Sequence, residues 1–203
     1  MLGVNGDAAD WDDTALLRAM ADGDEEALGY LYDRHAGWLT ARLSRRCSSS
    51  ELVDQAVQDT FLAVWTGAHG YRGGGDVAAW IWGVGIRRLV DTIRRDRARR
   101  PRPWWRRAEP VMVVSAEDQV LVGMEHGRLG PALASLSPEL RSAIEATVLD
   151  GLSTVEAAVL LGVPEGTVKS RCHRARQALR ALLAEAQPAN GGASPQRHAW
   201  GAP

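Results

Sequence analysis

Apolar side chains recur every three or four residues through the first hundred positions, a spacing that predicts amphipathic helices rather than strands. Aspartate or serine, both preferred N-cap residues, stands just before three of these stretches. We predict a helix after Asp12 or Asp13, a second from Asp24 to Leu43, a third over residues 51–65 and a fourth over residues 80–100. The residues expected to face inward in the first three are Ala15, Leu16, Ala19, Met20, Ala27, Leu28, Leu31, Tyr32, Trp38, Leu39, Leu43, Val53, Val57, Phe61 and Val64.

The sharpest local pattern lies between residues 151 and 180. Ser153 and Glu156 have the spacing of a capping box, in which the two residues satisfy each other's backbone N–H groups through their side chains. Gly162 tolerates the left-handed backbone in which helices end, and Pro164 suits the first turn of a following helix. These residues predict two helices joined by a tight turn. The inward stripes expected are Val155, Ala158, Val159 and Leu161 in the first helix, and Val168, Cys172, Ala175, Leu179 and Leu182 in the second, which runs over residues 164–184.

The polar side of that second helix is strongly basic. Arginine bonds guanine O6 and N7 bidentately, while lysine and serine suit phosphate oxygens, so this face fits a DNA major groove. A solvated basic helix is the alternative, but the capped first helix and the turn favour a DNA-binding helix-turn-helix. Cys172 and His173 favour packing over metal binding, because no second ligand pair stands at metal spacing in the sequence. The candidate DNA contacts are Thr167, Lys169, Ser170, Arg171, His173, Arg174 and Arg176.

The same patterns set the expected domain organisation. No segment alternates apolar and polar residues with a period of two, so we expect no sheet and an all-α fold. Residues 101–116, rich in Pro, Trp and Arg, are predicted to be a linker, because their prolines interrupt any helix. This linker joins two small helical domains, residues 12–100 and residues 117–186, and the second carries the helix-turn-helix. Residues 187–203, rich in Pro, Gly and Ala, are predicted to be a disordered tail.

Charge and cysteine content narrow the class of protein. The net charge is only −1, but acidic and basic residues are concentrated in different segments. Residues 7–33 hold nine acids and one base, Arg18, whereas residues 87–107 hold ten arginines and two acids. Opposite charges at separate places favour separate partners. Two cysteines are too few for a disulfide framework, so we expect free thiols. With no apolar run of about eighteen residues and an acidic start unlike a signal peptide, we expect a cytoplasmic protein without a membrane span.

Three segments together resemble a known family. Residues 152–179 (LSTVEAAVLLGVPEGTVKSRCHRARQAL) resemble the upstream-promoter-binding domain of bacterial sigma factors. Residues 52–65 (LVDQAVQDTFLAVW) and 76–95 (DVAAWIWGVGIRRLVDTIRR) resemble the other conserved domain of those factors. A two-domain chain of this size is similar to the extracytoplasmic-function group of the sigma-70 family. The likeness covers about residues 14–184.

The resemblance implies an all-helical subunit, without cofactor or metal, that binds core RNA polymerase and promoter DNA and leaves catalysis to polymerase. The helix-turn-helix would take the minus-thirty-five element as duplex. Polymerase binding would fall on the third helix, at Asp54, Gln58, Asp59, Phe61 and Trp65, although Phe61 fits either the core or this interface. Opened minus-ten DNA needs cationic and aromatic side chains. The candidates in the following loop and helix are Tyr71, Arg72, Asp76, Trp80, Arg87, Arg88, Asp91, Arg94 and Arg95.

Other partners and functions stay open at this point. Members of the family are often held inactive by a cognate anti-sigma factor, and Trp104 and Trp105 would either contact polymerase or dock the two domains together. A dimeric operator-binding regulator shares the helix-turn-helix but leaves the QDTFLAVW run of residues 58–65 unexplained. An enzyme acting on nucleic acid would need paired carboxylates, a metal cluster or a phosphate loop, and we find none of these patterns in the sequence. An adaptor that only bridges proteins would leave the basic helix unused.

Overall fold

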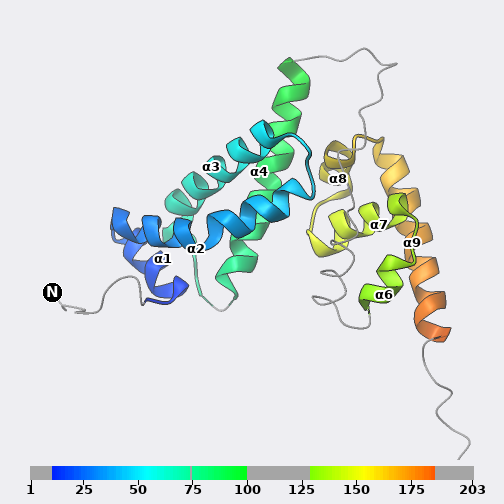
Figure 1. Ribbon diagram of the computed structural model, residues 1–203, viewed down its shortest axis with the longest axis horizontal. Helices are drawn as coiled ribbons and strands as arrows, with labels where there is room; N and C mark the ends of the chain where they lie inside the picture. Colours follow the sequence, from blue (N-terminus) through cyan, green and yellow to red (C-terminus); the bar gives the residue numbers. More distant parts are fainter. Residues whose placement is uncertain (1–10, 74, 100–128, 186–203) are drawn as a thin grey trace, which may run out of the picture.

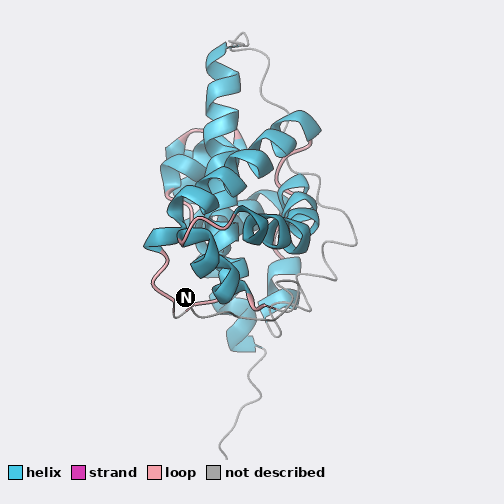
Figure 2. Cartoon of the chain, turned by 90° about the vertical axis from the view of Figure 1, so that its left-hand side faces the viewer, coloured by secondary structure: helices cyan, strands magenta, loops and turns pink. Residues whose placement is uncertain are grey.

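The computed structural model describes residues 11–73, 75–99 and 129–185. Within these ranges the chain folds into helices joined by turns, without strands (Figure 2), which confirms the all-α prediction. None of the helices in these ranges is long and apolar enough to cross a bilayer. The predicted linker with Trp104 and Trp105, and the predicted tail, lie outside the described residues.

The first helical bundle comes from the N-terminal half of the chain. It comprises α1 (Asp13–Ala21), α2 (Glu25–Ser44), α3 (Ser50–Gly67), the 3₁₀ turn η2 (Ala68–Gly70) and α4 (Val77–Arg99) (Figure 1). Asp12, Asp24 and Ser49 cap α1, α2 and α3 through their side chains, as the sequence predicts. The fourth helix begins earlier than the predicted residue 80, because the Asp76 carboxylate accepts a hydrogen bond from the Ala78 N–H at 2.9 Å and caps the helix there.

Close packing of α2, α3 and α4 forms the core of this bundle. Gly85 of α4 is needed at the crossing, since an added Cβ would lie 2.9 Å from Leu39 Cδ1. Most of the predicted inward residues are buried, but Tyr32 and Trp38 were wrongly placed: they are 43% and 37% exposed. Both rings lie at the edge of the apolar stripe of α2, where Tyr32 packs against the buried Phe61 ring and Trp38 against the buried Trp82 ring, and each stays partly open to solvent.

The second bundle contains the helix-turn-helix. It comprises α6 (Leu129–Ala134), α7 (Pro138–Ile144), the π-helical turn η3 (Glu145–Leu149), α8 (Thr154–Leu161) and α9 (Glu165–Glu185). The capping box of Ser153 and Glu156 is present, and Gly162 has a φ of 66° after α8, so both predictions are confirmed. Val155 was wrongly placed in the inward stripe of α8, because it is 54% exposed and the buried face is formed by Ala157 and Leu160.

The two bundles touch each other directly. In Figure 1, the short helix α8 lies beside α4, and the two helices pack together. Most buried apolar residues of the two bundles form one continuous cluster, which includes Leu43 of α2 and Leu160 of α8. A second, smaller cluster lies within the second bundle and consists of Leu133, Leu136, Ile144 and Ala175. Both cysteines, Cys47 and Cys172, are buried free thiols within the continuous cluster, as expected from their number.

Candidate functional site

The basic face of α9 is turned away from the core of its bundle. Val168, Cys172 and Ala175 are buried at the spacing the sequence predicts, and the Cys172 thiol donates a hydrogen bond to the Ala143 carbonyl oxygen at 3.4 Å. This is a packing role, and it fixes which side of the helix faces outward. Of the candidate DNA contacts, five are exposed and two are half-buried. The exposed residues are Lys169, Ser170, His173, Arg174 and Arg176, and the half-buried ones are Thr167 and Arg171.

The start of α9 is held rigidly against α8. The Glu165 carboxylate accepts hydrogen bonds from Lys169 Nζ at 2.8 Å and from Thr154 Oγ1 at 2.7 Å. These bonds, that from Lys169 foremost, lower the pKa of Glu165. The pair of Lys169 with Glu165 is exposed and therefore weak, so a polyanion can displace it and Lys169 stays part of the cationic face with Arg171 and Arg174.

Three of the minus-ten candidates fix the shape of the loop that precedes α4. The Tyr71 hydroxyl donates a hydrogen bond to the Gly75 carbonyl oxygen at 2.7 Å, and the Tyr71 ring centroid lies 5.2 Å from that of Trp80. Asp76 caps α4, as described above. Arg72 is exposed beside them. The structure therefore brings Tyr71, Asp76 and Trp80 together as supports of the loop and leaves Arg72 at its surface.

A small hollow opens between this loop, η2 and α1. Its volume is about 190 Å³, and its polar lining includes Arg18, His69 and Arg72. Sequence reasoning missed Arg18 and His69 as site residues. A signal for Arg18 was present, because it is the one base in the acidic stretch of residues 7–33.

The basic residues along α4 are largely paired with acids. Arg94 Nη1 lies 3.1 Å from Asp91 Oδ1, and Arg95 Nη1 lies 3.4 Å from Asp59 Oδ2 on α3. Arg87 Nε lies 4.0 Å from Glu156 Oε1 of α8. Exposed ion pairs of this kind are weak, so a polyanion can displace the acids. Arg88 is half-buried on the same helix.

An apolar groove runs between α2 and α3. It has a volume of about 540 Å³ and is lined by Tyr32, Phe61, Leu62 and Trp65, with Glu25 and Asp33 among its polar residues. Phe61 is 4% exposed and forms the floor, whereas Leu62 is 62% exposed. The structure thus brings together Phe61 and Trp65 from the candidate polymerase contacts. Tyr32 and Leu62 were missed, although an exposed leucine outside the buried stripe of α3 was a readable signal.

The polar candidates on α3 divide between two sides of that helix. Asp54 and Gln58 are exposed and share a face with Leu62, because these positions are four residues apart. Asp59 instead points toward α4, where it pairs with Arg95. Asp54 and Gln58 therefore extend the groove surface, and Asp59 belongs to the packing of α3 on α4.

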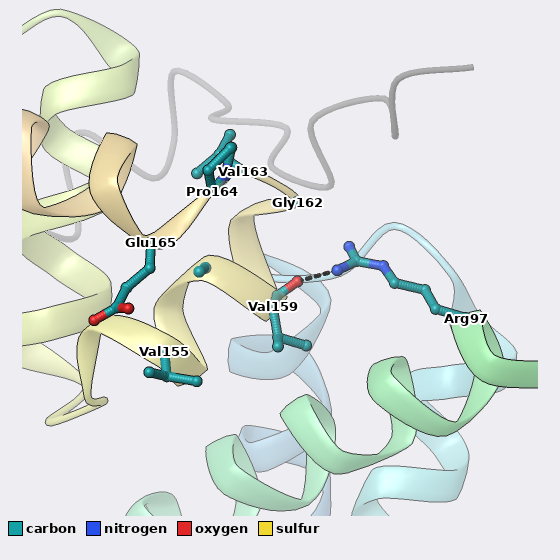
Figure 3. A pocket seen from close by; sticks show the side chains of 8 residues that line it. Arg97, Val155, Val159, Gly162, Val163, Pro164 and Glu165 are labelled. Carbon is teal, nitrogen blue, oxygen red and sulfur yellow. Dashed lines mark hydrogen bonds between the residues drawn. The ribbon is translucent and has the colours of Figure 1, made fainter. Parts of the chain in front are cut away.

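The end of α4 meets the helix-turn-helix. Arg97 Nη1 donates a hydrogen bond to the Val159 carbonyl oxygen of α8 at 2.6 Å (Figure 3). Beside this bond lies a shallow hollow of about 480 Å³, whose lining includes Val155, Val163 and Pro164. The first helix of the helix-turn-helix, α8, is therefore in contact with the same helix that carries most minus-ten candidates.

Comparison with known proteins gives consistent matches over both bundles. Residues 31–100 match the family model described as Sigma-70 region 2, and residues 126–179 match that described as Sigma-70, region 4. The ECF RNA polymerase sigma factor SigM of Mycobacterium tuberculosis is 36% identical over 173 residues, covering 84% of this chain and 84% of SigM. The ECF RNA polymerase sigma factor RpoE of Cereibacter sphaeroides is 33% identical over 178 residues, covering 86% of this chain and 95% of RpoE. Among solved structures, that of Rhodobacter sphaeroides SigE in complex with the anti-sigma ChrR is similar, with 29% sequence identity and a TM-score of 0.38. The match covers 84% of this chain and 97% of that chain.

Proposed function

Because the chain belongs to the extracytoplasmic-function sigma factors of the sigma-70 family, we propose that its two bundles share promoter recognition and that α3 carries it on core RNA polymerase. The protein is a transcription initiation factor: it binds core RNA polymerase and directs promoter-specific initiation. The family assignment favours this function over the dimeric operator-binding regulator. Catalysis of RNA synthesis belongs to polymerase, and we assign no catalytic residue to this chain.

The upstream element is proposed to bind α9 as duplex DNA. The supporting observation is the exposed cationic face of a helix whose start is fixed by the capped α8 and the Gly162 turn. A recognition helix contacts base edges through its N-terminal part, so Thr167, Ser170 and Arg171 would lie nearest the bases. Arg174 follows on the same face one turn later, and Arg176 is placed for phosphate contacts.

The minus-ten element is proposed to bind the loop and α4 as opened single strand. The positive charge of this surface comes from Arg72 in the loop and from Arg87, Arg88, Arg94 and Arg95 of α4. The hollow bounded by Arg18, His69 and Arg72 is an opening into which an unstacked base can turn. Tyr71, Asp76 and Trp80 would act by holding the loop in shape.

Core polymerase is proposed to bind the groove between α2 and α3. An apolar groove with exposed Tyr32 and Leu62 fits the apolar face of a partner helix. Asp54 and Gln58 extend this surface, and the acidic groups Glu25 and Asp33 at the groove favour a helix that also carries basic side chains.

Reconstituted transcription tests the proposal directly. The purified chain is added to core polymerase on a promoter library, and transcript starts are mapped by sequencing. We expect starts at defined sites that share an upstream and a downstream element. If core polymerase initiates identically with and without the chain, the proposed function is wrong. A cognate anti-sigma factor stays a prediction, tested by whether a partner that co-purifies with the chain abolishes these starts.

A further inference from the structure

A buried group of charges joins the two bundles. Arg46, just after α2, places Nη1 2.7 Å from Glu145 Oε2 and Nε 2.9 Å from Asp150 Oδ2. Arg46 Nη2 also donates a hydrogen bond to Asp150 Oδ1 at 3.1 Å. The three side chains are 14%, 6% and 0% exposed, in the order Arg46, Glu145 and Asp150. We call these three residues the Arg46 cluster.

The Arg46 cluster ties the second bundle to the first by charge. Both acids belong to the segment at η3, whereas their cationic partner comes from the opposite bundle. Burial alone would lower the pKa of Arg46, but the charges of Asp150 and Glu145 outweigh it and hold the pKa above its ordinary value. Removing one side of a buried charge group leaves the other side desolvated and unpaired, which is strongly unfavourable. The closed arrangement therefore depends on all three residues.

Two further contacts lay α8 along the candidate DNA face of α4. Arg97 donates to the Val159 carbonyl oxygen (Figure 3), and Arg87 lies near Glu156. Both arginines stand on the same helix as the minus-ten candidates. By contrast, Arg174 and Arg176 of α9 are exposed. Contact between the bundles thus restricts one of the two proposed DNA-binding surfaces and leaves the other open.

Promoter geometry requires that the bundles separate. The minus-thirty-five and minus-ten elements are about 25 base pairs apart, or about 85 Å at 3.4 Å per base pair. A compact body of roughly 150 residues is only ~40 Å across. Residues 100–128 join α4 to α6, and 29 residues can span up to about 100 Å when extended. The chain is long enough to bind both elements, but only after the Arg46 cluster has come apart.

We propose that the Arg46 cluster holds the free chain in a closed, autoinhibited form, in which α8 limits access of promoter DNA to α4. The occlusion of DNA rests on the function proposed above for α4, whereas the closure itself does not. In the open form all three charged groups meet water, so neutral replacements destabilise only the closed form. Promoter DNA then favours the open form, because it binds α4, the surface that closure restricts.

Four variants of the full chain test the closure. Arg46→Gln removes the cation, and Glu145→Gln with Asp150→Asn removes both acids while keeping side-chain size. Arg46→Lys keeps the charge but loses the paired geometry, so it should open the chain less than Arg46→Gln does. Arg99→Gln is the matched control, since Arg99 is exposed at the end of α4 outside the cluster. Circular dichroism melts identify any variant whose bundles fail to fold.

Energy transfer between dyes on Thr66→Cys and Ala181→Cys measures the separation of the bundles, because these exposed sites lie on α3 and α9. The native Cys47 and Cys172 thiols are both buried, and burial raises the pKa of Cys47, so dyes react first at the exposed introduced sites. We expect high transfer in the parent chain and in Arg99→Gln, and a clear loss in Arg46→Gln and in the double acid variant. Unchanged transfer in both folded variants overturns the closure, whatever the chain does with polymerase.

The second measurement is affinity for fork-shaped promoter DNA without polymerase. Opening should raise affinity on the order of tenfold in Arg46→Gln and in the acid variant, since loss of the buried pair shifts the population toward the binding-competent form. Arg99→Gln should show no such gain. Loss of energy transfer without a gain in DNA affinity overturns the autoinhibition. Failure of the parent chain to direct initiation by core polymerase overturns the proposed function instead, and the energy-transfer result would remain valid.

Discussion

Leu62 lies 62% exposed on the wall of the groove between α2 and α3, where the proposed polymerase contact would bury it. We predict that Leu62→Ala weakens binding to core polymerase while leaving the free chain folded. Complete burial of a leucine side chain contributes ~1.5–3 kcal/mol. Only the exposed 62% of this side chain can still be buried by polymerase, so the substitution should lower the binding free energy by about 1 to 2 kcal/mol. That corresponds to an increase of about 5- to 25-fold in Kd.

The assay is a titration of fluorescently labelled chain with core polymerase. Leu183→Ala is the matched control, because Leu183 is also an exposed leucine, at 39%, but lies on α9 in the other bundle. The control should keep the parent Kd. Thermal unfolding of both variants should change by no more than ~0.5 kcal/mol, as expected for surface substitutions. Phe61 cannot serve here, since truncating this buried ring would cost about 3–5 kcal/mol of stability.

A Kd for Leu62→Ala within twofold of the parent would refute the assignment of the groove. An equal loss in Leu62→Ala and Leu183→Ala would also contradict it, because the effect would then follow from exposed apolar surface in general.

Three other outcomes follow from the structure. Arg174→Ala should weaken the binding free energy by about 1–3 kcal/mol for DNA with the preferred base at one position of the upstream element. Fluorescence anisotropy on promoter variants measures this, and an equal loss on every sequence would mark a phosphate contact instead. Ser153→Ala removes the α8 cap and should lower the free energy of unfolding by about 1 kcal/mol in denaturant titrations. Ser153 Oγ also donates to the Glu156 carboxylate, and hydrogen bonds from Ser153 lower the pKa of Glu156. The part of the deficit due to this bond is present above the unfolded-state pKa of Glu156 and is lost as pH falls through its folded-state value, whereas the cap bond from the Glu156 N–H does not depend on pH; a deficit that does not shrink in acid would contradict this. Gly85→Ala should destabilise the first bundle by about 1–3 kcal/mol, because its Cβ would lie 2.9 Å from Leu39 Cδ1; an unchanged melting temperature would show that Leu39 moves aside freely.

Local features of the fold were predictable from the sequence because their causes lie within a few residues. Asp24 and Ser153 cap helices through neighbouring N–H groups, and Gly162 ends α8 with a positive φ. The buried seam of α9, including Val168 and Ala175, follows from helical spacing alone.

Features that depend on distant residues were not predictable in the same way. Arg46 meets Glu145 and Asp150 across 99 and 104 positions, and nothing near Arg46 in the sequence distinguishes it from other arginines. Periodicity predicts Tyr32 to be a core residue, because it cannot separate a buried stripe from a stripe that borders an interface groove. The candidate site residues fall on the expected elements, but their grouping into groove, loop and recognition face needed the packing of α2, α3 and α4.

The apolar cluster that runs through both bundles has a consequence for cellular half-life. When the chain leaves a promoter, the surfaces of α4 and α8 that contact each other in the closed form are exposed to solvent. Proteases and other proteins with exposed apolar surface can then reach them. Because the two bundles are tethered at an effective concentration in the millimolar range, re-association is fast and hides these surfaces again. We therefore expect closure to protect the idle factor from degradation, so that variants that weaken it shorten cellular half-life even where transcription from a saturating supply is normal.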